Sequence, residues 1–506
     1  MKRPIRTLLI ANRGEIALRI LRTCRERGIR VIAVYSDADR TMPHVVQADE
    51  AYPIGPAPAS ESYLKISALI DVARRAGADA VHPGYGFLAE NPEFARAVHE
   101  AGLIFVGPPP EAIEAMGDKT SARKLVTASG VPVVPGSGQP LNDLQEAEQF
   151  CRKIGYPVLL KAAAGGGGKG MRSVQGPADL ASSFRAAKSE AQSAFGDARV
   201  YVEKFLEHPR HIEFQILADQ HGNAIHLGER ECSLQRRHQK IIEESPSVLL
   251  DPDMRRRMGE TAVRAALSCG YVNAGTIEFL VDREKNFYFL EMNTRLQVEH
   301  PVTEERTGLD LVAEQIRIAE GFPLERTQEM VDFRGHAIEC RVCAEDPSNG
   351  FLPSTGTLTY LRPPQGPGVR EDRGFDAGND ISVYYDSLLA KLITWAPTRE
   401  AAIQRMRRAL QEYRIAGVTT NISLLISLIE DPAFVAGDLS TAFVQHHLDT
   451  HPRRGLSDSA IQAAAAICAG MHARGATDHA VTGAPPGHRR GGWTSLRHKG
   501  WRPTRG

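Results

Sequence analysis

The feature that most restricts the fold is a run of four glycines ending at a lysine, in KAAAGGGGKGMRSV at residues 161–174. A β-like stretch, GYPVLLKAA, precedes it, and another, MRSVQG, follows it and is broken by Gly176 and Pro177. A glycine loop between two strands predicts a hairpin flap whose backbone N–H groups can lie over a phosphate chain. Lysines at both ends, Lys161 and Lys169, favour this interpretation over a flexible linker.

Two other phosphate motifs fit this run poorly. A Walker A loop needs a glycine six residues before the lysine and a hydroxyl residue after it, but those positions hold Ala163 and Gly170. The dinucleotide fingerprint matches literally at Gly165, Gly167 and Gly170, yet that motif must open a helix. The strand-like sequence that follows therefore leaves the hairpin flap as the prediction.

The first ~110 residues alternate between strand and helix patterns, which predicts a doubly wound α/β domain. The expected strands are TLLIAN, IRVIAVYSDAD, DAVHPGYG and GLIFVGP, and the expected helices are GEIALRILRTCRERG and SYLKISALIDVARRAG. An NAD site with Asp37 or Asp39 at the ribose is disfavoured, because the first turn, ANRGE, has one glycine where the fingerprint needs three.

Two acidic residues are expected to face each other in the segment 273–304. It is predicted to form two strands joined by the turn DREKN, and folding between Glu284 and Lys285 places Glu278 opposite Glu291. Facing carboxylates repel unless a cation compensates them. The pattern therefore indicates a cation at this pair.

Polar residues then recur at every second position, which predicts one polar strand face if the strand stays regular. Phe287 and Phe289 should begin that face, and the opposite face should be apolar. Burying such polar groups is costly without ligands, and oxygen donors of this kind suit magnesium that bridges phosphates. The polar series is Glu291, Asn293, Arg295, Gln297 and Glu299, against Met292, Leu296 and Val298.

Charge and cysteine content narrow the class of protein. Lysine plus arginine and aspartate plus glutamate both number 61, so no nucleic-acid partner is expected, and no apolar run of 18 residues predicts a membrane span. The N-terminus lacks a signal-peptide pattern, and seven scattered cysteines suit a reducing cytoplasm. The one CxxC, Cys340 to Cys343, lies in an alternating strand pattern and predicts buried thiols rather than a metal site.

Several long blocks together resemble biotin carboxylase, the ATP-grasp component of acetyl-CoA carboxylase and of related biotin-dependent carboxylases. The resemblance runs from about residue 4 to 447. It rests on NRGEIA, HPGYGFLAEN, MGDKTSAR, KAAAGGGGKGM, VEKFLEHPRHIEFQ, ERECSLQRRHQKIIEESP, FLEMNTRLQVEHPVTE and GHAIECRVCAEDP. In that family the glycine hairpin is a lid over the nucleotide phosphates.

The resemblance implies an α/β and α+β architecture in three parts. These are a Rossmann-like domain at residues 1–117, an ATP-grasp domain at 118–330 with a lid subdomain at about 131–205, and a mixed α/β C-terminal domain at 331–447. Residues 448–506 are expected to be a basic, disordered tail, since residues 451–506 hold nine Lys/Arg against two Asp.

Carried over by position, the resemblance implies sites for three substrates and a metal. Bicarbonate would be held by Lys240, Arg295, Gln297 and the Val298 backbone, and biotin by Arg341; Glu299, Arg295, Arg341 and Lys240 would be catalytic, with Glu299 as the base. Two Mg²⁺ or Mn²⁺ ions would bind Glu278, Glu291 and Asn293. ATP would contact Lys119, Lys161, Gly167, Gly168, Glu203, Lys204, Phe205, Leu206, His211, Gln235, His238, Glu278 and Glu291.

The implied reaction is ATP-dependent carboxylation of biotin by bicarbonate through carboxyphosphate, in acetyl-CoA carboxylase or a related acyl-CoA carboxylase. No Met-Lys-Met biotinylation triplet occurs, so biotin would arrive on a separate carrier protein or as the free vitamin. A carboxyltransferase subunit and a second copy of the chain are the other implied partners.

Three alternatives remain. The chain could serve a pyruvate carboxylase, be another ATP-grasp ligase, or be a silent ATP-binding subunit. RLQVEHP together with ECRVCAEDP disfavours another ligase. The presence of all five key residues, Glu278, Glu291, Arg295, Glu299 and Arg341, disfavours a silent subunit. Taken singly, a histidine such as His211 or His238 is more often structural, and the RRHQK cluster could be a solvated face.

Overall fold

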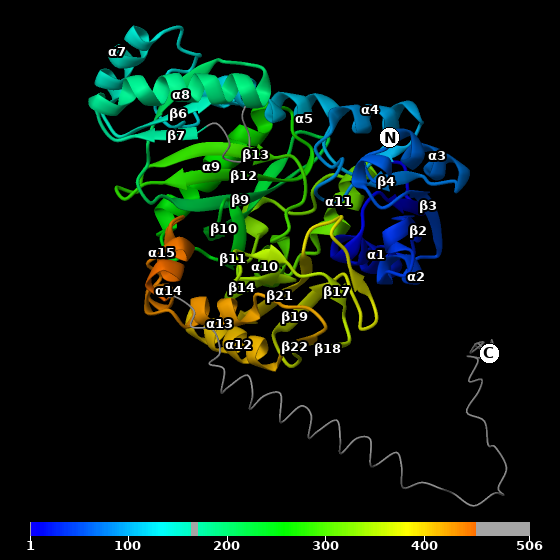
Figure 1. Ribbon diagram of the computed structural model, residues 1–506. Helices are drawn as coiled ribbons and strands as arrows, with labels where there is room; N and C mark the ends of the chain where they lie inside the picture. Colours follow the sequence, from blue (N-terminus) through cyan, green and yellow to red (C-terminus); the bar gives the residue numbers. More distant parts are fainter. Residues whose placement is uncertain (1, 163–170, 452–506) are drawn as a thin grey trace, which may run out of the picture. The chain divides into compact units, whose positions relative to one another are not determined.

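The computed structural model describes residues 2–162 and 171–451 (Figure 1). The side chains of Lys119, Thr120, Ala194 and Phe195 are also outside this description. The predicted lid glycines Gly167 and Gly168, and the predicted tail from residue 452 onward, therefore lie outside the described residues. Within the described residues, no helix is both long and apolar enough to cross a bilayer.

The N-terminal part is a five-stranded parallel sheet with helices on both faces, which confirms the predicted doubly wound fold. Its strand order is β3-β2-β1-β4-β5, so the order reverses between β1 and β4, where ligands bind in such folds. The bounds are β1 Thr7–Ile10, β2 Arg30–Ser36, β3 Glu50–Gly55, β4 Ala80–His82, β5 Ile104–Phe105, α1 Gly14–Glu26, α2 Pro43–Gln47, α3 Ile66–Arg75, α4 Pro92–Glu100 and α5 Pro110–Gly117.

The glycine run is flanked by two paired strands, as predicted. Strands β6 (Val158–Ala162) and β7 (Met171–Val174) are antiparallel, with Lys161 opposite Met171, and β8 (Val200–Lys204) pairs with the other edge of β6. This small sheet packs with α7 (Leu144–Ile154) and α8 (Pro177–Phe195), at the upper left of Figure 1. Helix α6 (Lys119–Ala128) leads toward it along the chain.

The central sheet has eight strands in the order β13-β12-β9-β10-β11-β14-β21-β19. It runs across the predicted boundary at residues 330 and 331, because β14 of the third part pairs with β11. The third part therefore extends the sheet by hydrogen bonds instead of only packing on it. The bounds are β9 Arg210–Ala218, β10 Ala224–Arg236, β11 Gln239–Ser245, β12 Asn273–Val281, β13 Phe287–Asn293, β14 His336–Cys343, β19 Val369–Arg373, β21 Leu388–Ala396, α9 Pro252–Ser268, α10 His300–Thr307 and α11 Leu311–Ala319.

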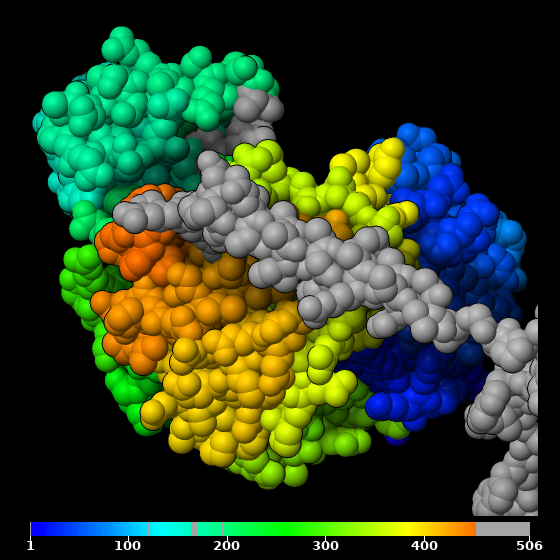
Figure 2. All heavy atoms as spheres, turned by 60° about the horizontal axis from the view of Figure 1, so that its bottom comes forward, coloured from blue at the N-terminus to red at the C-terminus, as the bar shows by residue number. Residues whose placement is uncertain are grey.

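Four helices pack their apolar side chains against one face of the sheet end formed by β11, β14 and β21. They are α12 (Arg399–Glu412), α13 (Ile422–Glu430), α14 (Pro432–Ala436) and α15 (Phe443–Thr450), yellow to orange in Figure 2. Cys340 and Cys343 are buried free thiols on β14, as predicted.

The alternating stretch GTLTYLRPP, at residues 356–364, forms two short strands and not one. It forms β17 (Gly356–Thr357) and β18 (Tyr360–Arg362), which pair with β20 (Asp380–Ile381) and β22 (Arg414–Ala416) respectively. The change of partner falls between Leu358 and Thr359, whose backbone N–H groups donate to Asn379 and Ala416 respectively. The remaining short elements are β15 Glu345–Asp346, β16 Leu352–Pro353, and 3₁₀ turns at Asp37–Asp39, Ala59–Glu61 and Gln328–Met330.

Candidate functional site

Glu278 on β12 lies directly opposite Glu291 on β13, as the hairpin argument predicted. The next pair is Phe279 with Phe289, so Leu290 is an extra residue in β13. This bulge turns Phe289 toward the apolar core, where it joins Met292. The expectation that Phe287 and Phe289 begin the polar face was therefore wrong.

The strand also ends earlier than expected, so that only the first residues of the predicted polar series belong to it. Strand β13 ends at Asn293, and α10 begins at His300, so Arg295, Gln297 and Glu299 lie on the connecting loop. They nevertheless converge with residues of the central sheet. The loop, rather than a regular alternation, brings them together.

A cavity of about 1450 Å³ contains most of the predicted residues. It is also lined by N-terminal residues that follow β1 and β4, at the reversal of the parallel sheet. Lys119, whose side chain is not described, and the lid glycines cannot be placed. The predicted residues that line it are Lys161, Glu203, Lys204, Phe205, Leu206, His211, Gln235, His238, Lys240, Glu278, Glu291, Asn293, Arg295, Gln297, Val298 and Arg341.

Lys240 is the centre of a buried charge cluster. Its Nζ lies 2.5 Å from Glu213, 2.8 Å from Glu278 and 2.6 Å from Glu299. Burial by itself lowers the pKa of Lys240, but the three carboxylates raise it well above its ordinary value. The Lys240 ammonium is thus protonated and forms ion pairs with all three carboxylates.

Glu278 is compensated by more than Lys240. His211 Nε2 lies 2.8 Å from Glu278 Oε2, and Asn293 Nδ2 donates to Oε1 at 2.8 Å. Burial would raise the pKa of Glu278, but Lys240 and His211 lower it far below its ordinary value. The carboxylate is therefore ionised and available to a cation.

Glu278, Glu291 and Asn293 fit a magnesium ion by the chemistry of their donors. All three offer side-chain oxygens from two paired strands, and Mg²⁺ prefers hard oxygen ligands. The cavity beside them leaves room for the phosphates and waters that usually complete its coordination.

Glu299 is fully buried, and its two oxygens contact different cations. Lys240 lies at Oε1, and Arg341 Nη2 donates to Oε2 at 2.8 Å. Burial would raise the pKa of Glu299, but Lys240, Arg341 and Arg230 lower it well below its ordinary value. Glu299 is therefore ionised.

Arg341 on β14 lies between two carboxylates. Its Nε donates to Glu243 Oε1 at 2.6 Å, in addition to the Glu299 contact. Burial raises the pKa of Glu243 to about 7, although Arg341 opposes this shift. Glu339 lies opposite Glu243 in the β11–β14 register and is also fully buried. The guanidinium thus stands among three acids.

Arg295 is held at the cavity wall by a residue from the N-terminal part. Its Nε donates to Glu90 Oε2 at 2.8 Å, and Glu90 also accepts from the Thr294 backbone at 3.1 Å. Arg295 Nη1 donates to Gln297 Oε1 at 3.1 Å. Loop 294–299 is therefore fastened to the five-stranded domain.

The opposite end of the cavity lies beside the small sheet. The Lys161 ammonium and the Arg123 guanidinium both pair with Glu203, which is buried. Lys204 Nζ donates to the Gly155 carbonyl at 3.2 Å and the Tyr156 carbonyl at 3.0 Å. The Lys204 side chain thus binds the backbone of the two residues that precede Pro157 and β6.

The RRHQK cluster forms a tight turn at the cavity rim. Arg237 and His238 join β10 to β11 with φ of 48° and 68°, and both are exposed. Two successive positive φ values match a type I′ hairpin turn, which non-glycine residues adopt at a cost. Gln235 lies just before it, with Nε2 3.5 Å from His211 Nδ1.

Sequence reasoning missed several charged partners of the site. Glu213 and Arg230 face each other in the β9–β10 register, both fully buried, and Arg230 Nε donates to Glu213 at 2.5 Å. Charges inside the apolar strands HIEFQIL and ERECSL were the available signal. Glu243 and Glu90 were also missed, because their partners are 98 and 205 residues away.

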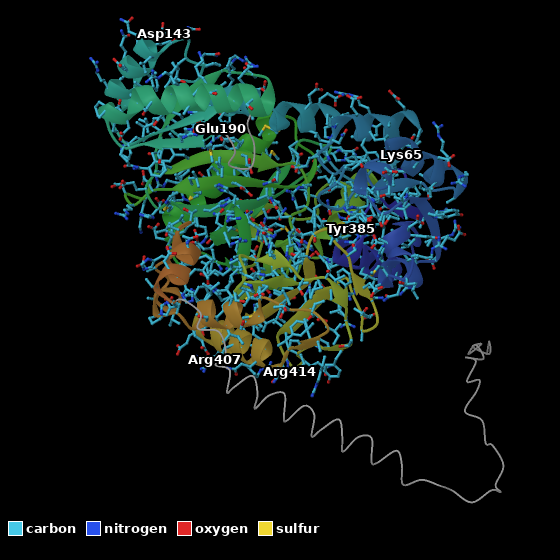
Figure 3. The ribbon with its side chains drawn as sticks, viewed as in Figure 1. Lys65, Asp143, Glu190, Tyr385, Arg407 and Arg414 are labelled. Carbon is cyan, nitrogen blue, oxygen red and sulfur yellow. The ribbon has the colours of Figure 1, made fainter. Side chains whose placement is uncertain are left out.

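The N-terminal wall of the cavity was missed as well. Arg13 pairs with Asp39 at 2.6 Å and lies over the ring of Tyr385, which is labelled in Figure 3. Tyr385 in turn reaches the Ser36 hydroxyl at 2.5 Å and donates to the Ala57 carbonyl at 2.5 Å. Residues from the N-terminal part and from the third part thus form this wall together.

Comparison with known proteins shows the family of this chain. Three family models match: the biotin carboxylase N-terminal domain at residues 4–113, the carbamoyl-phosphate synthase L chain ATP-binding domain at 118–327 and the biotin carboxylase C-terminal domain at 339–446. The chain is 55% identical over 438 residues to the biotin carboxylase of Nostoc sp., covering 87% of this chain and 98% of that one.

A longer relative and a solved structure are also similar. The propionyl-CoA carboxylase alpha chain of Ruegeria pomeroyi is 51% identical over 486 residues, which are 92% of this chain and 71% of that one. The biotin carboxylase domain dimer of Hydrogenobacter thermophilus 2-oxoglutarate carboxylase, solved with MgADP, ADP and bicarbonate, has a TM-score of 0.84 and 48% identity. The match covers 90% of this chain and 100% of that one.

Proposed function

Because the chain belongs to the biotin carboxylase family of ATP-dependent ligases, we propose that its cavity carboxylates biotin with bicarbonate and ATP. The observation that carries this proposal is the joint contact of Lys240 and Arg341 with Glu299. An ionised buried carboxylate between two cations provides a base beside two anion-binding groups.

We assign the nucleotide to the cavity end formed by β6, β8 and the β12–β13 hairpin. Lys161, which lines this end, would contact the ATP phosphates, and Glu203 to Leu206 would line the adenine. Glu278, Glu291 and Asn293 would hold magnesium, which when bound supplies charge neutralisation on the phosphates. We also assign three residues to ATP on the basis of the sequence resemblance alone: Lys119, Gly167 and Gly168.

Bicarbonate is assigned to the loop 294–299 and Lys240. Lys240 and Arg295 supply positive charge, with Gln297 and the Val298 backbone as further contacts. Glu299 takes the bicarbonate proton as an oxygen of bicarbonate attacks the γ-phosphorus of ATP, giving carboxyphosphate and ADP. Fixed cations stabilise the charge that develops in this transfer.

Biotin is assigned to the side of Arg341. Carboxyphosphate releases CO₂, and the phosphate left behind takes the ureido N–H proton. The biotin nitrogen then attacks CO₂. The Arg341 guanidinium stabilises the negative charge on the ureido oxygen, for which it must turn from Glu243 or Glu299.

We further propose that biotin arrives on a carrier protein and that a carboxyltransferase subunit uses the product. The similar Ruegeria protein is longer than the matched region, and its name identifies an acyl-CoA carboxylase. Acetyl-CoA or a related acyl-CoA is the proposed final acceptor, with pyruvate as the alternative. The solved relative is described as a domain dimer, which supports a homodimer for this chain. Cytoplasmic location and use of Mn²⁺ remain predictions.

Bicarbonate-dependent ADP release, measured with and without free biotin, tests the proposal. A biotin carboxylase should release ADP slowly with bicarbonate alone and faster when biotin is added. A silent ATP-binding subunit should show neither activity. ADP release that needs a different carboxylate and ignores bicarbonate would instead indicate another ATP-grasp ligase.

A further inference from the structure

A buried lysine outside the predicted set touches the proposed bicarbonate loop. Lys391 lies on β21 directly opposite Arg341 in the β14–β21 register, and its side chain is fully buried. Its Nζ donates to the Val298 carbonyl at 3.0 Å. That carbonyl belongs to the peptide that joins Val298 to Glu299.

Lys391 forms an ion pair with Glu15 in addition to its hydrogen bond to the loop. Nζ lies 3.2 Å from Glu15 Oε2 and 4.0 Å from Asp372 Oδ2. Asp372 already pairs with Arg370 at 2.8 Å and with Arg22 at 3.2 Å. Neutralising Asp372 therefore does not require Lys391, whereas the Val298 carbonyl is a specific hydrogen-bond acceptor.

Three parts of the chain meet at this ammonium group. Glu15 is at the start of α1, Lys391 is on the central sheet, and Val298 is in the loop between β13 and α10. The loop is anchored on its other side by the contacts of Glu90 with Arg295 and Thr294. Lys391 thus provides a second attachment, next to the base Glu299.

We propose that Lys391 is a positioning residue, which holds the Val298–Glu299 peptide so that the loop presents its backbone and Glu299 to bicarbonate. This inference rests on the proposed function, since it assumes that loop 294–299 binds bicarbonate. A lysine is suited to the task because a charged donor to a carbonyl gives a stronger hydrogen bond than a neutral one. The side chain itself stays outside the cavity lining.

The test is steady-state kinetics of full-length Lys391→Met with separate titrations of bicarbonate and MgATP. Losing a hydrogen bond from a charged donor should raise the KM for bicarbonate by about 10- to 100-fold. The KM for MgATP should stay within about twofold, because the nucleotide end is a separate region. An unchanged KM for bicarbonate, or an equal rise in both values, would overturn the inference.

Arg399→Met is the matched control. Arg399 is a largely buried cation that pairs with Glu244 and donates to the carbonyls of Phe434 and Val435, away from the cavity lining. Its loss should lower thermal stability and leave both KM values unchanged. A rise in the KM for bicarbonate in this control would show that any loss of a buried cation has the same effect.

A second variant keeps the test decisive if Lys391→Met does not fold. Glu15→Gln combined with Lys391→Met also removes the acid that Lys391→Met alone would leave without its cation. This double variant should show the same selective rise in the KM for bicarbonate. Failure of both variants to fold would make Lys391 a requirement of the fold and contradict a positioning role. Absence of bicarbonate-dependent ADP release in the wild type would instead refute the proposed function itself.

Discussion

Arg341 donates a hydrogen bond from Nη2 to Glu299 Oε2 at 2.8 Å. The group proposed to stabilise the biotin enolate is therefore an ion-pair partner of the group proposed to deprotonate bicarbonate. Lys240 holds the other oxygen of Glu299 at 2.6 Å. Glu299 thus keeps one cation when Arg341 turns toward biotin, which allows the two half-reactions to be separated by mutation.

Arg341→Gln should remove mainly the biotin-dependent activity. A donor aimed at developing oxyanion charge contributes about 10²–10³ in rate, and biotin carboxylation should fall by that factor. Bicarbonate-dependent ADP release without biotin should stay near normal, because Lys240 still holds Glu299. A parallel fall of both activities would place Arg341 in the bicarbonate or phosphate site.

Glu299→Gln should suppress both activities, including the slow ADP release in the absence of biotin. The amide keeps the shape of the side chain but cannot accept the bicarbonate proton, a loss worth about 10²–10⁴ in rate. Binding of MgADP, followed by calorimetry, should persist. Near-normal ADP release in this variant would mean that another group is the base.

Glu291→Gln should lose activity at ordinary magnesium concentrations while keeping its fold. Its carboxylate faces Glu278 across the ladder, so the change removes one anionic oxygen donor of the proposed metal site. ADP release measured against Mg²⁺ concentration should move to higher concentrations. Glu284→Gln, at the exposed turn of the same hairpin, is the matched control and should leave the curve unchanged. Full turnover of Glu291→Gln at low magnesium would refute the metal assignment.

Lys161→Gln should weaken ATP binding. Lys161 ends the strand that leads into the glycine run, and its ammonium pairs with buried Glu203 at the proposed nucleotide end. Loss of one charge-assisted contact should raise the Kd for MgATP by about tenfold or more. The exposed Lys153→Gln, on α7, should bind normally. Unchanged affinity in Lys161→Gln would show that the nucleotide lies elsewhere.

Stability in acid should depend on His82. Burial lowers the pKa of His82 to about 3, although a contact with Gln315 at 3.2 Å opposes the shift. The folded form binds fewer protons than the unfolded form below about pH 6.5, so the free energy of unfolding falls as the pH decreases.

His82→Asn removes this titration and should keep an acceptor for the Gly84 N–H that now bonds Nδ1 at 3.0 Å. The stability deficit of the variant at pH 7 should shrink by about 2 kcal/mol by pH 4.5 in urea unfolding. Exposed His446→Asn should show no such change. A constant deficit would mean that His82 is not buried as a neutral ring.

The sequence by itself determined the local features of the site. Turn residues and alternation were sufficient to pair Glu278 with Glu291 and to flank the glycine run with β6 and β7. These features depend on residues close in the chain, where periodicity and turn chemistry act directly. The long motif blocks also indicated the biotin carboxylase family, and the comparisons confirm this.

Only the tertiary structure decided which charges compensate each other. Arg341 is 42 residues from Glu299, and Lys391 is 93 residues from Val298, so no periodicity could pair them. The alternation of polar and apolar residues also failed to predict the bulge at Leu290 and the end of β13 at Asn293. Such contacts arise because strands of the sheet and the loop after β13 bury their charges at a common place, where the low dielectric makes an unpaired charge costly.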